Sequence, residues 1–102
     1  MIGFHPEALE EIEGARDWYE EKRPGLGQDL VDEIERVLAR LADAPLSFAR
    51  APESRAARRA QLSRFPYWLI FAPLDDGDVL IVALAHARRR AGYWRGRATA
   101  KR

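Results

Sequence analysis

Residue types that can do chemistry gather near the C-terminal end of the sequence. His86 is followed by Arg88, Arg89 and Arg90, and then by Tyr93, Trp94 and Arg95. Cations beside aromatic rings can hold phosphate groups and stack a nucleobase. Histidine titrates near neutral pH, so His86 could also act as a general acid or base. This segment is a candidate site for nucleic acid, for an acidic protein segment, or for proton transfer.

The same residues also have plainer interpretations. His86 could be a strand-end histidine whose ring bonds a backbone group and shapes the following loop, and the arginines could simply face solvent. Arg58, Arg59 and Arg64 form a second basic group, along and just after a predicted strand. Charged side chains there could bind a partner, or could keep an edge strand from aggregating.

Cysteine is absent from the sequence, and histidine occurs twice, as His5 and His86. Disulfides, thiolate catalysis and cysteine-based metal sites are therefore excluded. The two histidines lie far apart in the sequence without a local ligand pattern. We expect no metal site and no cofactor.

Charge is distributed unevenly along the chain, although the net charge is only +1. Residues 1–49 contain 5 Lys/Arg and 12 Asp/Glu, whereas residues 50–102 contain 12 Lys/Arg and 4 Asp/Glu. Such a split predicts an acidic half that keeps the protein soluble and a basic half that meets an anionic partner.

The N-terminus is followed at once by acidic residues, unlike a signal peptide. The longest apolar run, Val79 to Ala85, is far shorter than the roughly 20 residues that span a bilayer. We expect a soluble cytoplasmic protein.

Two helices are predicted in the first half, after a brief strand over Ile2–Phe4. Apolar residues recur at spacings of three and four from Pro6 to about Lys22, and again from Leu26 to near Asp43. The connection at residues 23–27 contains one proline and two glycines and is short, so the helices should be antiparallel neighbours.

Three strands are predicted in the second half, after a loop over residues 45–57 with room for one helical turn. They begin at Arg58, Tyr67 and Val79, and a turn signal at residues 75–78 joins the last two. Val79 to Ala85 is apolar on both faces, which is typical of a central strand covered on both sides. The expected fold is α+β, with a helix hairpin on one face of a small, mainly antiparallel sheet that ends in a three-stranded meander. We expect one domain over residues 1–95 and a flexible basic tail over residues 96–102.

Several local patterns carry a resemblance to a known family over nearly the whole chain. The patterns are Phe4-His5-Pro6-Glu7-Ala8, Trp18-Tyr19, Pro24-Gly25-Leu26-Gly27, Arg58-Arg59, Arg64-Phe65-Pro66-Tyr67, Ala85-His86, Arg88-Arg89 and Gly92-Tyr93-Trp94. With these patterns in this order, the sequence is similar to the ParE-like branch of the RelE/ParE toxin superfamily, whose members are often described as plasmid stabilisation proteins. The resemblance implies a type II toxin and a cognate antitoxin that masks its active surface.

Two activities occur in that superfamily: RelE-like members cut messenger RNA on the ribosome, and ParE-like members poison DNA gyrase without hydrolysing anything. In RelE-like toxins, cleavage uses two lysines, two arginines and a tyrosine. When the sequences are aligned through the Tyr67 strand, the lysine positions hold Arg59 and Gln61, and the first arginine position holds Trp68. The second arginine position is occupied by Arg88. The tyrosine position is occupied by Trp94, which is adjacent to Tyr93. Most of the catalytic set is absent, which favours a gyrase inhibitor.

Two alternatives stay open. One is a ribosome-dependent ribonuclease that uses Arg59, His86, Arg88 and Tyr93, and the other is a non-toxic binding module of the same fold. For binding the target or the antitoxin, the candidate residues are Arg58, Arg59, Arg64, His86, Arg88, Arg89, Arg90, Tyr93, Trp94 and Arg95.

Overall fold

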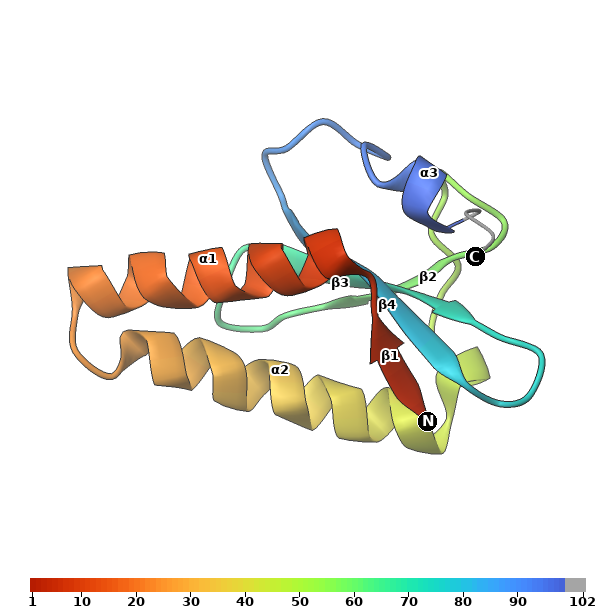
Figure 1. The fold of residues 1–102 in the computed structure, drawn as a ribbon, viewed down its shortest axis with the longest axis horizontal. Helices are drawn as coiled ribbons and strands as arrows, with labels where there is room; N and C mark the ends of the chain where they lie inside the picture. The colour runs from red at the N-terminus through yellow and green to blue at the C-terminus, as the bar shows by residue number, and fades with distance from the viewer. Residues whose placement is uncertain (99–102) are drawn as a thin grey trace.

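Two long antiparallel helices lie against one face of a small mixed sheet in the computed structural model, which describes residues 1–98 (Figure 1). No helix in this described part is long and apolar enough to cross a membrane. The elements are β1 (Ile2–Phe4), α1 (Pro6–Lys22), α2 (Leu26–Asp43), η1 (Pro45–Ser47), β2 (Arg58–Gln61), β3 (Tyr67–Pro73), β4 (Val79–His86) and α3 (Arg95–Ala98).

The helical hairpin has clear local causes. The ring of His5 accepts a hydrogen bond from the Glu7 N–H at the start of α1, where Pro6 occupies the first turn. At the other end, the carboxylate of Glu20 accepts from the backbone N–H groups of Gly25 and Gly27. A Cβ on Gly27 would lie 2.5 Å from the Arg16 carbonyl oxygen, so the close approach of the helices requires glycine.

The strand order is β1-β4-β3-β2. Strands β2, β3 and β4 pair antiparallel, which confirms the predicted meander, and β1 pairs parallel with β4. β4 therefore has a neighbour on each side, as its apolar sequence predicted. On the β1 side that pairing ends at Ile81, and the rest of β4 has no neighbouring strand there.

A register shift interrupts the pairing of β3 with β4. Ile70 pairs with Ala83 and Phe71 with Ile81, so Val82 has no partner in the β3 ladder. Ile81 and Leu84 lie in the core under the helices, whereas Val82 and Ala83 lie in the core on the opposite face. Because every residue of this run is apolar, the sequence contains no signal for the shift.

Both faces of the sheet are covered. Leu30, Ile34, Leu69 and Phe71 belong to the core between sheet and helices. On the other face, Ala51, Ala57, Ile70, Val82 and Trp94 form a second core beneath the loop before β2 and the C-terminal segment.

The C-terminal segment differs from the expected flexible tail. Residues 96–98 belong instead to α3, and the side chain of Arg97 is 11% exposed and paired with acidic groups of α1. Burial of Trp94 and this pairing hold the segment on the sheet. The rest of the expected tail, residues 99–102, lies outside the described residues.

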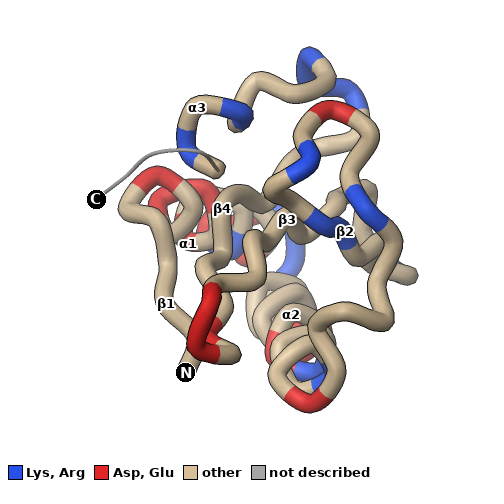
Figure 2. Tube along the Cα trace, turned by 90° about the vertical axis from the view of Figure 1, so that its right-hand side faces the viewer, with Lys and Arg blue, Asp and Glu red and all other residues tan. Residues whose placement is uncertain are grey.

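The basic and acidic residues, which are separated along the sequence, are also separated in the folded protein. Figure 2 shows Lys and Arg mainly along β2, the loop before it and the C-terminal segment. Asp and Glu lie mainly on the helices and in the β3–β4 turn. The basic half of the sequence therefore covers the side of the sheet opposite the helices.

Glu33 of α2 is a buried carboxylate, with 5% of its surface exposed. It accepts hydrogen bonds from the N–H and hydroxyl of Ser63 and from the Arg64 N–H, in the turn between β2 and β3. Burial by itself raises the pKa of Glu33, but these hydrogen bonds outweigh it and lower the pKa below the usual 4.5. The carboxylate thus attaches the β2–β3 turn to α2.

We expect Glu33→Ala to lower the free energy of unfolding by about 1–3 kcal/mol at pH 7, because buried donors lose their acceptor. The folded pKa is depressed, so this contribution is present above the unfolded pKa and is lost as the pH falls through the folded value. Urea unfolding at pH 7 and at about pH 3 measures both effects. The control is Glu35→Ala, on the exposed side of α2. If wild type and Glu33→Ala differed in free energy of unfolding by the same amount at both pH values, this role of Glu33 would be contradicted.

Candidate functional site

The loop after β4 is shaped by backbone hydrogen bonds around His86. The Ala87 N–H donates to the Pro66 carbonyl, and the Arg89 N–H donates to the His86 carbonyl. The Arg88 N–H donates to Nδ1 of the His86 ring at 3.0 Å. His86 therefore does what the plainer interpretation expected: it shapes the loop that presents the three arginines.

The far end of this loop is held by tight packing. Gly92 has a φ of +74°, and a Cβ there would lie 3.1 Å from the Glu53 side chain. Trp94 is 2% exposed and packs in the second core. The ring of Trp94 therefore covers the sheet, which leaves little of its surface for stacking on a partner.

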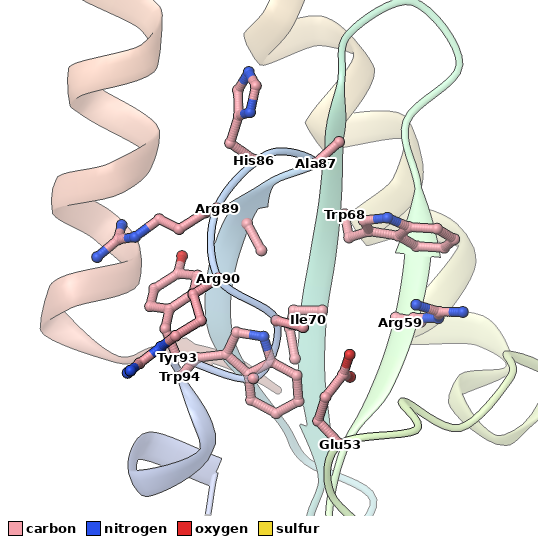
Figure 3. Close-up of a pocket in the computed structure, with 13 residues that line it drawn as sticks. Glu53, Arg59, Trp68, Ile70, His86, Ala87, Arg89, Arg90, Tyr93 and Trp94 are labelled. Atoms are coloured by element: carbon pink, nitrogen blue, oxygen red, sulfur yellow. The ribbon is translucent and has the colours of Figure 1, made fainter.

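A cavity of about 190 Å³ lies between this loop and strands β2 and β3 (Figure 3). Arg59 and Trp68 line one side, and the guanidinium of Arg59 lies 4.0 Å from the centre of the Trp68 ring. Arg89 and Tyr93 line the other side, where the guanidinium of Arg89 lies 3.8 Å from the centre of the Tyr93 ring. The cavity is thus bordered by two cation–aromatic pairs.

The carboxylate of Glu11, on α1, connects the loop to the rest of the protein. It accepts hydrogen bonds from the Leu84 N–H at 3.1 Å, the Tyr93 hydroxyl at 2.9 Å and the Arg97 guanidinium at 2.9 Å. Arg89 lies 3.4 Å from the same carboxylate. We call Glu11, Arg89, Tyr93 and Arg97 the Glu11 network.

The Glu11 network also supplies partners for the part of β4 beyond β1. Arg97 donates to the Val82 carbonyl at 3.1 Å, while Glu11 accepts from Leu84. Backbone groups buried without partners are costly, so these side chains replace the missing strand. Arg97 also pairs with Glu7 at 3.1 Å, which ties α3 to the first turn of α1.

Two tyrosines near the cavity are held in the protonated form. Burial raises the pKa of Tyr93 far above its usual value of 10, and the hydrogen bond to Glu11 raises it further. Burial and interaction with Tyr19 raise the pKa of Tyr67 to about 12. Neither hydroxyl is suited to accept a proton near neutral pH.

The structure brings together some of the predicted residues and separates others. Arg58 donates to the Phe48 carbonyl at 2.6 Å, Arg64 pairs with Asp29 at 3.4 Å, and Arg95 is exposed on α3, all away from the cavity. Arg88 belongs to the loop but does not line the cavity. Those that line it are Arg59, His86, Arg89, Arg90, Tyr93 and Trp94.

Sequence reasoning missed four residues of this region. Glu53 and Trp68 line the cavity, and Glu11 and Arg97 hold its loop. Glu11 looks like one more acid on an acidic helix, and its partners are 73 or more positions away in the sequence. Within the described residues, no group of three or more His, Cys, Asp or Glu side chains is placed to hold a metal ion.

Comparison with known proteins identifies the family. Residues 2–91 match the family model described as the ParE toxin of the type II toxin–antitoxin system parDE. The chain belongs to the ParE toxin family. It is therefore the toxin component of a type II toxin–antitoxin system, and that system implies a cognate antitoxin as its partner.

Solved structures agree with the fold of this ParE-family toxin. One described as the chromosomal ParDE system from P. aeruginosa matches with a TM-score of 0.74 and 17% identity, covering 85% of this chain and 95% of that one. The isolated E. coli RelE toxin matches with a TM-score of 0.65 and 17% identity, covering 91% of this chain and 89% of that one. A comparison with curated proteins gave no match.

We expect Glu11→Ala to destabilise this ParE-family toxin by about 2–3 kcal/mol, because Arg97, Tyr93 and the Leu84 N–H lose their shared acceptor. The Glu11 side chain is 16% exposed, so solvent partly screens its interactions. Urea unfolding tests this, with Glu10→Ala as the control from the same helix turn. If the two variants were equally stable, the Glu11 network would not hold the C-terminal segment.

Proposed function

We propose that this toxin inhibits growth by binding DNA gyrase, and that its antitoxin neutralises it by covering the same basic loop. Gyrase acts on chromosomal DNA, so the proposal also assigns the toxin to the cytoplasm. The observation that carries it is that two groups a ribonuclease would use, His86 and Tyr93, form hydrogen bonds that hold the structure, while within residues 1–98 Arg88 and Arg90 are exposed and form no ion pair.

Cleavage of a phosphoester requires a base for the attacking hydroxyl, an acid for the leaving oxygen and cations at the phosphate. The Tyr93 hydroxyl donates to Glu11 instead, and its raised pKa disfavours proton transfer. Nδ1 of His86 is occupied by the Arg88 N–H, and Figure 3 shows the ring pointing away from Arg59. These features support binding over hydrolysis.

The loop arginines supply charge for such binding. Within residues 1–98, Arg88 and Arg90 are exposed and form no ion pair. Their backbone is fixed at one end by His86 and at the other by Gly92 and Trp94, so little ordering is needed when a partner binds. Acidic groups of either gyrase or the antitoxin could pair with them, which explains how one protein could block the other.

The alternative is a ribosome-dependent ribonuclease, as in RelE-like toxins. It is kept because Arg59, His86 and Tyr93 line one cavity, as three of the four proposed catalytic residues. Arg88, the fourth, does not line it. A non-toxic binding module of the same fold remains a second alternative.

We expect the purified protein to inhibit supercoiling by gyrase and to leave messenger RNA intact on programmed ribosomes. Charge reversal at Arg88 and Arg90 together should raise the inhibitory concentration about tenfold or more, because the new carboxylates would repel the acidic groups with which the arginines pair. Arg23→Glu, in the exposed turn between α1 and α2, is the control and should have no effect.

Cleaved messenger RNA with unaffected gyrase would overturn the proposal in favour of the ribonuclease. No effect in either assay and no growth defect on induced expression would indicate the non-toxic module.

A further inference from the structure

A second cleft lies on the same side of the sheet as the first cavity, at the other end of β3. Trp68 and Ile70 line the first cavity, whereas Ala72 and Pro73 line this cleft. Its volume is about 320 Å³. Apart from α3, its walls come from η1, from the loop before β2 and from the ends of β2 and β3, and the proposed gyrase-binding loop does not contribute to it.

Two leucines flank the cleft and are unusually exposed. Leu46 of η1 is 67% exposed, and Leu74, just after β3, is 50% exposed. Single exposed leucines are common on proteins and need no explanation. These two come from segments 28 positions apart and border one cleft, together with Ala56 and Pro73. They form an apolar rim that no other described segment covers.

The same cleft is basic. Arg50, Arg55 and Arg58 line it, and none of the described Asp or Glu residues does. Within the described part of the chain, Arg50 and Arg55 are exposed and form no ion pair, while Arg58 donates to the Phe48 carbonyl. Figure 2 shows basic positions gathered along the loop before β2 and at the start of β2.

We propose that this cleft is a second docking surface, which binds an acidic segment of a partner protein that also carries apolar anchor side chains. Carboxylates of the segment pair with Arg50 and Arg55, and an aliphatic side chain packs between Leu46 and Leu74. A recessed apolar site with a few charged groups at its rim is typical of peptide side-chain recognition.

The chemistry of the lining favours a protein over a nucleic acid. Single-stranded nucleic acids stack their bases on aromatic rings, and no aromatic residue in the described part of the chain lines this cleft. A phosphate backbone offers no apolar group that could pack against the two leucines. Because Arg88 and Arg90 lie elsewhere, the toxin could hold one partner at this cleft while another occupies the loop.

The probe is a fluorescently labelled peptide of about twelve residues that contains several glutamates and two leucines one helical turn apart. Two matched peptides replace either the glutamates by lysine or the leucines by serine. We expect the first peptide to bind the full-length protein with a Kd of about 10–100 μM and both matched peptides to bind at least about tenfold more weakly. In NMR spectra, the amide signals of Leu46, Ala56 and Leu74 should shift on titration, which needs no variant.

The variants are the double change Arg50→Glu with Arg55→Glu, and separately Leu74→Ser. Each should weaken peptide binding about tenfold while circular dichroism shows an unchanged fold. Arg23→Glu is the control and should bind as wild type does. Gyrase inhibition should be unchanged in the cleft variants. A failure of the cleft to bind the peptide is therefore distinguishable from failure of the proposed gyrase function.

The proposal is overturned if the acidic leucine peptide does not bind, or if its shifts map to residues 86–94 instead. It is also overturned if a single-stranded oligonucleotide or anionic lipid vesicles compete with the peptide for the cleft at lower concentration than unlabelled peptide does.

Discussion

The short length of β1 creates the constraint on which the rest of the structure depends. β1 ends at Phe4, so β4 continues beyond it and no strand bonds the buried backbone groups on that edge. Glu11 and Arg97 complete this edge, from the helix on one side and the C-terminal segment on the other. A partly buried carboxylate destabilises the fold unless several hydrogen-bond donors surround it. Glu11 meets that condition because it accepts from several donors at once. One ionic cluster thereby joins α1, β4 and α3.

The Glu11 network also helps to hold the basic loop that we propose as the binding surface, on the side of the sheet opposite the helices. The register shift at Val82 turns apolar side chains of β4 toward that side, and the C-terminal segment covers them with Trp94. The covering segment begins with Arg88, Arg89 and Arg90, so the residues that complete the core also fix the position of the basic loop. The same segment therefore contributes to the stability of the fold and carries the loop that we propose as the binding surface.

The sequence predicted those features that depend on local periodicity and turn chemistry. Both helices, the hairpin connection at Gly25, the meander and the central position of β4 are confirmed, because spacing and turn residues encode them directly. The roles of Glu11, Trp94 and Arg97 could not be predicted, since each depends on a partner distant in sequence. Arg58 and Arg64 show the same limit: their charge is visible in the sequence, but the direction of each side chain is set by tertiary packing.

The most direct test of the account is amide hydrogen exchange of the toxin, measured free and with purified gyrase added. If the basic loop is the contact surface, the amides of Arg88, Arg89, Arg90 and Tyr93 should become protected by gyrase, while the helical hairpin stays unchanged. Programmed ribosomes should give no such protection. Protection of these amides by ribosomes and not by gyrase would contradict the account and identify the cavity as a site of RNA cleavage.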